Sequence, residues 1–206
     1  MSKTVQTGLL VAFVVVAVAA LTYGLTGSGD SGESATQSNQ PQKVTILKYS
    51  DYQCPACKTY AGPVEQLKNE FGELVEVEYK HFPLNSHQYA PIAGYAVEAA
   101  RNQGKFKEMH DMIFANQEIW SKGGAREHFI SYAEDLGLDV EQFKSDLESD
   151  VIHAKVEQNK QEGIRRQVNA TPTFFINGVK IRQNPQSYEQ FKAMVEMFMY
   201  RGNVPG

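Results

Sequence analysis

The chain contains two cysteines, Cys54 and Cys57, and together they form a single C-x-x-C motif. Cysteines this close cannot crosslink distant parts of a fold, and a disulfide between them closes a loop too short to add much stability. The pair is therefore suited to chemistry rather than to architecture. The motif directly follows Val44 to Ser50, an apolar and β-branched segment that predicts a buried strand. A strand that runs straight into C-x-x-C places the cysteines at the start of the next helix.

The helix start predicts different chemistry for the two cysteines. Helix N-termini present unpaired N–H groups and a partial positive charge, which stabilise a thiolate and lower its pKa below about 8.5. Pro55 suits the first helical position, where its missing N–H is not needed. The N–H groups of Ala56 and Cys57 are expected to point at the Cys54 sulfur. Cys54 is therefore the predicted nucleophile, and Cys57, one turn deeper, is the predicted resolving thiol.

The elements are predicted to follow the order strand, helix, strand, a long helical block, β-hairpin and helix. A helix is expected over residues 54–71, with an interruption at Pro63. Residues 74–82 alternate between apolar and polar side chains and predict a second strand. Helical spacing dominates from about residue 85 to 168, and Asn177-Gly178 between two apolar runs predicts a tight hairpin. The expected fold class is an α/β sandwich with a helical insertion.

Residues 1–25 are predicted to be an N-terminal membrane anchor. Gly8 to Leu25 is an 18-residue run without a charge, just long enough to span a bilayer as a helix. Lys3 precedes the run, and Asp30 and Glu33 follow it. This asymmetry favours an N-terminus inside the cell and a domain outside it.

A cleaved signal peptide is the alternative, because Ala17-Val18-Ala19 resembles a cleavage site. Both alternatives export the rest of the chain. Residues 26–42 are rich in Ser, Gly and Gln and predict a flexible linker. Residues 43–206 remain, about 160 residues, which is enough for one domain with a sizeable core.

Charge and histidine placement bear on the possible ligands. The net charge is -4 and no Lys/Arg cluster stands out, so nucleic acid is not expected as a partner. A zinc or copper site would need the C-x-x-C pair plus two histidines, and the five histidines are scattered without metal-like spacing. No metal site is therefore expected, and a C-x-x-C metal-binding or metallochaperone module is the alternative from another functional class.

Two segments together carry a resemblance to a known family. The sequence SDYQCPACKTY, followed about 115 residues later by NATPTFFING, resembles the DsbA-like thiol–disulfide oxidoreductases of the thioredoxin superfamily, most closely the membrane-anchored bacterial members. The resemblance covers most of residues 43–200 and implies a thioredoxin fold with a helical insertion. It also implies that Thr171 and Pro172 form a cis-proline loop beside the cysteines. In the family, the backbone before this proline pairs with an extended substrate chain.

The resemblance implies an oxidase that introduces disulfides into exported proteins. It further implies recycling by a membrane disulfide oxidoreductase and no bound cofactor. Pro55 and Ala56, between the cysteines, are the expected redox-tuning residues. DsbA has Pro-His there and thioredoxin has Gly-Pro, so the direction of the reaction is open, and a disulfide reductase or isomerase is the alternative enzyme.

Two charged residues are weaker candidates for the same site. Asp51 lies three residues before Cys54 and could relay protons to Cys57, although shaping the loop is the simpler role. Lys80 belongs to the polar face of a predicted strand, where solvated charges are the default, and a place near the cysteines is the alternative.

Overall fold

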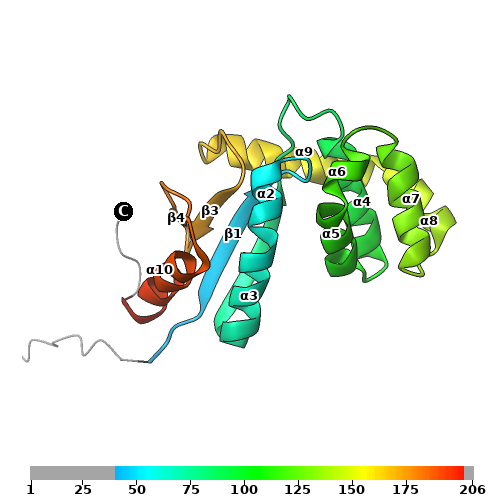
Figure 1. Ribbon diagram of the computed structural model, residues 1–206. Coiled ribbons are helices and arrows are strands. Elements are labelled where there is room, and N and C mark those ends of the chain that lie inside the picture. The colour runs from blue at the N-terminus through cyan, green and yellow to red at the C-terminus, as the bar shows by residue number, and fades with distance from the viewer. Residues whose placement is uncertain (1–39, 202–206) are drawn as a thin grey trace, which may run out of the picture. The chain divides into compact units, whose positions relative to one another are not determined.

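The computed structural model describes residues 40–201, with side chains up to residue 200. Its centre is a four-stranded sheet with the strand order β2-β1-β3-β4, of which Figure 1 labels β1, β3 and β4. β1 pairs in parallel with β2 and antiparallel with β3, which forms a hairpin with β4. The strands are β1 (Val44–Ser50), β2 (Val75–His81), β3 (Thr173–Ile176) and β4 (Val179–Lys180). The predicted strands and hairpin are confirmed, and β4 is shorter than its apolar run.

Two short helical elements and two longer helices complete the part of the fold around the sheet. β1 is followed by α2 (Pro55–Thr59), α3 (Ala61–Phe71) and a 3-10 turn, η1 (Gly72–Leu74), and β4 is followed by α10 (Tyr188–Arg201). Side chains of β1, β3, α3 and α10 share one buried cluster that includes Ile46, Val64, Leu67, Phe174 and Phe191. One face of the sheet is therefore covered by α3 and α10.

The helical block lies between β2 and β3, as the sequence predicts. It consists of α4 (Ala90–Asn102), α5 (Phe106–Ala115), α6 (Gln117–Trp120), α7 (Ala125–Asp135), α8 (Val140–Leu147) and α9 (Asp150–Arg165). α4 contacts α5, α7, α8 and α9, and α9 also contacts β2. In Figure 1 the chain returns through α9 to β3. The apolar cluster of this block extends to the cysteine pair, and its members include Cys57, Val97, Met109, Phe129 and Phe143. The α/β fold with a helical insertion is confirmed.

The predicted interruption at Pro63 is wrong in position. The helix breaks instead at Tyr60, between α2 and α3, and Pro63 lies in the first turn of α3. A proline is tolerated there because the first N–H groups of a helix have no partner within the helix. The first of the following N–H groups, that of Val64, donates to the carbonyl of Tyr60 at 3.2 Å. The break turns the chain after the cysteines without disturbing α3.

The predicted anchor at residues 1–25 lies outside the described residues, as does the predicted linker up to residue 39. Between residues 40 and 201, no helix combines the length and the apolar character needed to cross a bilayer.

Candidate active site

Cys54 is the N-cap residue of α2, at the end of the loop that follows β1. Its backbone is extended, with φ -77° and ψ 120°, and Pro55 occupies the first helical position as predicted. Both cysteines are free thiols. Cys54 is 7% exposed and Cys57 is fully buried. The predicted order of depth is confirmed, but Cys54 is more covered than a freely exposed thiol.

The surroundings of Cys54 favour its thiolate. The hydrogen bond from the Cys57 thiol lowers the pKa of Cys54 to about 5, against the opposing effect of partial burial. The side chain of Thr171 and the backbone N–H groups of Ala56 and Cys57 make smaller contributions to the same lowering of the pKa. These two N–H groups at the helix start act in the expected direction, although the Cys54 side chain makes no capping hydrogen bond to α2. The site therefore holds a sulfur that is ionised at neutral pH.

Cys57 has the opposite environment. Burial raises the pKa of its thiol well above the usual range, and the hydrogen bond to Cys54 acts in the same direction. Its sulfur also accepts a hydrogen bond from the backbone N–H of Asp51 at 3.4 Å. One cysteine of the pair is thus ionised and the other is a neutral thiol, which matches the roles of attacking and resolving sulfur.

The Thr171-Pro172 loop lies directly beside Cys54, although 117 residues separate Thr171 from it. The Thr171-Pro172 peptide bond is cis, as expected from the resemblance. The Cys54 sulfur lies 3.5 Å from the carbonyl oxygen of Thr171. Pro172 leads into β3, whose antiparallel pairing with β1 brings the loop to the same end of the sheet as the cysteines.

Asp51 organises the cysteine loop through its side chain. One carboxylate oxygen accepts the backbone N–H groups of Gln53 at 2.7 Å and Cys54 at 3.2 Å. The other accepts the backbone N–H of Leu84 at 2.8 Å and lies 2.8 Å from Nδ1 of His87. The carboxylate has no bond to Cys57, so the loop-shaping role is the one that its contacts support.

Gln117 of α6 connects the helical insertion to the same loop through two hydrogen bonds. Its buried amide donates to the backbone carbonyls of Tyr52 at 2.7 Å and Cys54 at 3.0 Å. Nothing in the local sequence marks this glutamine, because its partners are 65 and 63 residues away. Together Asp51 and Gln117 fix the backbone on which Cys54 is carried.

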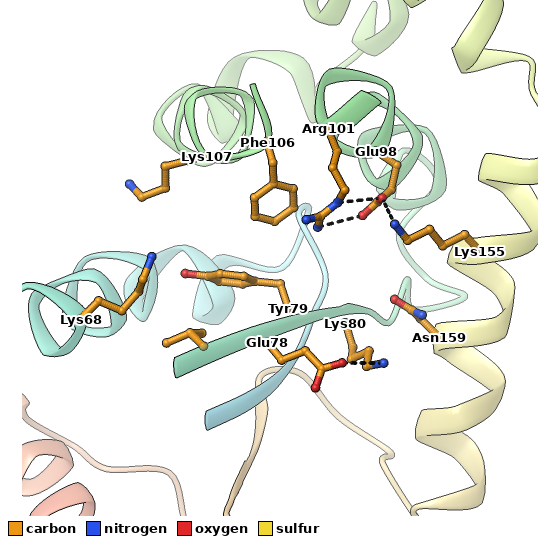
Figure 2. Close-up of a pocket in the computed structure, with 11 residues that line it drawn as sticks. Lys68, Glu78, Tyr79, Lys80, Glu98, Arg101, Phe106, Lys107, Lys155 and Asn159 are labelled. Atoms are coloured by element: carbon orange, nitrogen blue, oxygen red, sulfur yellow. Dashed lines mark hydrogen bonds and ion pairs between the residues drawn. The ribbon is translucent and has the colours of Figure 1, made fainter. Parts of the chain in front are cut away.

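Lys80 does not lie at the cysteine pair. It lines a cavity of about 400 Å³ beside β2, where it forms ion pairs with Glu78 at 2.8 Å and Glu162 at 3.1 Å. Figure 2 shows the same cavity with Glu98 held between Arg101 and Lys155. A buried cation whose charge interacts with the sulfurs is Lys48 of β1, which sequence analysis did not single out.

The part of the chain that the structure describes contains no group of three or more Cys, His, Asp and Glu residues arranged to hold a metal ion. Cys57 accepts a hydrogen bond from the backbone of Asp51, Cys54 lies against the Thr171 carbonyl at the start of α2, and the two thiols interact with each other.

Fold and site define a class of protein. An ionised cysteine at a helix N-terminus, a buried partner thiol and an adjacent cis-proline loop stand on a thioredoxin fold with a helical insertion. This is the architecture of the DsbA-like thiol–disulfide oxidoreductases.

Three solved structures have the same fold. A thioredoxin-like oxidoreductase from Silicibacter pomeroyi is 24% identical, with a TM-score of 0.66 over 81% of this chain and 91% of that one. BdbD from Bacillus subtilis is 20% identical, with a TM-score of 0.65 over 77% and 91% of the two chains. Wolbachia pipientis α-DsbA1 is 17% identical, with a TM-score of 0.66 over 78% and 87%.

A family model described as thioredoxin matches residues 31–197, and the chain belongs to this family. Among curated proteins it is similar to the Na⁺/H⁺ antiporter NhaA of Herminiimonas arsenicoxydans, with 37% identity over 140 residues and 68% of this chain. NhaA 1 of Mycobacterium sp. strain KMS is 36% identical over 141 residues and 66% of this chain. The chain spans 22% of the length of each of these antiporters, so the similarity concerns one segment of them.

Proposed function

We propose that the chain is an extracytoplasmic oxidase that transfers the Cys54–Cys57 disulfide to reduced exported proteins. The observation that carries this proposal is the contrast within the pair: Cys54 is stabilised as a thiolate and Cys57 is a buried neutral thiol. A stabilised thiolate is a good leaving group, so a disulfide that contains it is readily passed on.

The reaction proceeds by two thiol–disulfide exchanges. A substrate thiolate attacks the sulfur of Cys54 in the disulfide, and Cys57 leaves as a thiolate and takes up a proton. A second substrate thiolate then attacks the substrate sulfur of this mixed disulfide, which releases Cys54 as a thiolate and leaves a disulfide in the substrate. The two electrons from the substrate now reside on the reduced Cys54–Cys57 pair.

We assign substrate binding to Thr171 and Pro172 and redox tuning to Pro55 and Ala56. Thr171 meets the Cys54 sulfur through its carbonyl, so an extended substrate chain bound along this loop would bring its own sulfur to Cys54. Pro55 and Ala56 offer no side-chain charge or hydrogen bond to the thiolate. Recycling is assigned to a membrane disulfide oxidoreductase, which accepts the two electrons by the same exchange.

The oxidase function is tested with the oxidised full chain and a peptide that contains two thiols. The expected result is one peptide disulfide formed for each pair reduced, and no reaction by Cys54→Ser. With oxidised glutathione in place of the peptide, Cys57→Ala is expected to accumulate the Cys54–glutathione mixed disulfide, because no Cys57 thiol remains to displace the glutathione. If the chain catalyses insulin reduction by dithiothreitol but leaves the peptide unoxidised, the reductase alternative replaces the oxidase.

We also propose that residues 1–25 anchor the chain in the membrane and that residues 26–42 are a tether, with the catalytic domain from residue 43 outside the cytoplasm. The uncharged run Gly8 to Leu25 and the acidic residues after it support this orientation. The similarity to segments of two antiporters, which are membrane transport proteins by name, agrees with a domain held at a membrane. Recovery of the chain in the membrane fraction after alkaline extraction, with protease access only from outside, is the expected result. Release of a shortened chain favours the signal-peptide alternative.

A further inference from the structure

Lys48 lies in the middle of β1, where a charged side chain is unexpected. It is fully buried. Like Ile46, two residues earlier in the strand, it points to the face of the sheet that α3 and α10 cover. In the sheet it stands between Tyr79 of β2 and Phe174 of β3. β1 leads directly into the loop that carries Cys54, so this lysine belongs to the strand that positions the cysteine pair.

The ammonium group of Lys48 has no hydrogen-bond partner among the described residues, and no carboxylate of residues 40–200 lies within ion-pair distance of it. Its nitrogen lies 5.4 Å from the ring centre of Phe114 and 6.0 Å from that of Tyr79. Aromatic rings attract a cation, but they do not replace a counter-ion. Burying a charge without a partner costs folding free energy. A buried lysine of this kind is therefore expected to have a function.

The two cysteine sulfurs are the groups around Lys48 that can carry a negative charge. Cys57 and Cys54 both raise the pKa of Lys48, while burial lowers it to about 8. Burial raises the pKa of Tyr79, so this phenol is neutral at physiological pH. Burial likewise lowers the pKa of His110, the titratable group of α5 that faces this cluster, to about 3, so it is also neutral.

We propose that Lys48 is the residue that makes the cysteine pair oxidising: its buried positive charge stabilises the reduced, thiolate form and gives no such stabilisation to the disulfide. This inference rests on the function proposed above and adds a residue of β1 whose charge acts on both sulfurs. It also explains how a motif with Pro55 and Ala56 between the cysteines can be oxidising, since Lys48 supplies the positive charge that these residues lack. Because the ammonium is desolvated, its interaction with a thiolate is stronger than that of a surface lysine.

The test measures the redox equilibrium of the full chain with glutathione. Lys48→Met keeps the length of the side chain and removes its charge, and Lys48→Gln is a second neutral variant in case methionine disturbs the packing. Both are expected to shift the equilibrium constant about tenfold towards the disulfide form, which corresponds to about 1.4 kcal/mol. Lys80→Met is the matched control, because Lys80 lies on the neighbouring strand and pairs with Glu78 and Glu162. The equilibrium constant of Lys80→Met with glutathione is expected to equal that of the wild type.

A second measurement separates charge from packing. The pH at which Cys54 reacts with iodoacetamide at half of its maximal rate is expected to rise in both Lys48 variants. In Lys80→Met this pH is expected to equal that of the wild type. Equal constants and equal pH profiles for the wild type and both Lys48 variants would overturn the role of Lys48 and leave the oxidase function standing. A wild-type pair that does not exchange with glutathione would overturn the proposed function itself, and the inference with it.

Discussion

At the scale of single residues, the chemistry depends on small differences in depth and contact. Cys54 and Cys57 are three residues apart, yet the hydrogen bond from the Cys57 thiol holds Cys54 as a thiolate, and burial keeps Cys57 neutral. The motif predicts this difference because it arises locally. The role of Lys48 cannot be predicted from the sequence, because it depends on contacts that are not local. In VTILKYS it is one polar residue of a strand, and it becomes a buried cation only when the helices cover the sheet.

Cys54 is expected to react with iodoacetamide with a midpoint near pH 5, because the folded site lowers its pKa to about that value. Alkylation of the reduced chain, followed by mass spectrometry of its peptides, measures the rate at each pH. Cys57 is expected to remain unlabelled until the chain is denatured, when both thiols should react with a midpoint of about 8.5. A midpoint for Cys54 above pH 8 in the folded chain contradicts a stabilised thiolate.

Asp51→Ala is expected to destabilise the reduced chain by roughly 2–4 kcal/mol. The substitution removes the acceptor of three backbone N–H groups, and a buried donor left without a partner costs about 1–3 kcal/mol. Urea unfolding at pH 7 measures the loss. Asp111→Ala is the control, since Asp111 makes a surface ion pair with Lys107, and such pairs contribute about 0–1 kcal/mol. If the two variants lose the same free energy of unfolding, the Asp51 hydrogen bonds stabilise the fold no more than a surface ion pair does.

At the scale of elements, alternation and turn residues predict the strands and the hairpin, because those signals are local. Asn177 and Gly178 both have positive φ, 48° and 82°, as a two-residue hairpin requires. The position of the helix break could not be predicted in the same way. Tyr60 ends α2 while its hydroxyl donates to the carbonyl of Pro185 at 2.7 Å, a contact 125 residues away that no local pattern reveals.

Gly163→Ala is expected to destabilise the fold by roughly 1–3 kcal/mol, although alanine is the better helix former. A Cβ at this position of α9 would lie 2.7 Å from the ring of Phe82 and 3.0 Å from that of Tyr49, and packed aromatic rings cannot easily move away. Gly62→Ala in α3 is the control, since its Cβ would meet nothing within 4 Å. That variant should gain up to about 1 kcal/mol from helix propensity. Thermal unfolding compares the two, and a stabilised Gly163→Ala would mean that α9 is free to shift.

At the scale of the whole domain, redox state and stability are coupled. The thiolate of Cys54 exists in the reduced form alone, so its stabilisation favours reduced over oxidised protein. Because the folded pKa lies below the unfolded value, this contribution is fully present above the unfolded pKa and is lost as pH falls through about 5. The free energy of unfolding of the whole domain therefore depends on the ionisation of the Cys54 sulfur.

The reduced form is therefore expected to unfold at a higher denaturant concentration than the oxidised form at pH 7, and the gap should shrink at pH 4. Each pH unit between the folded pKa and the ambient pH contributes about 1.4 kcal/mol. Guanidinium unfolding of both redox forms at the two pH values measures it. A disulfide form that is more stable at pH 7 favours the reductase or isomerase alternative and leaves the fold unchanged.

The placement of α9 beside β2 has a consequence for self-association. A sheet edge with free backbone groups can template pairing with another molecule and seed aggregates. On β2 the N–H of His81 donates to the side chain of Asn159 of α9 at 3.2 Å, so a helix occupies one end of that edge. The opposite edge, β4, has two residues, which is too short to recruit a neighbouring strand. The same helix that closes the insertion thus helps to keep neighbouring copies from joining edge to edge.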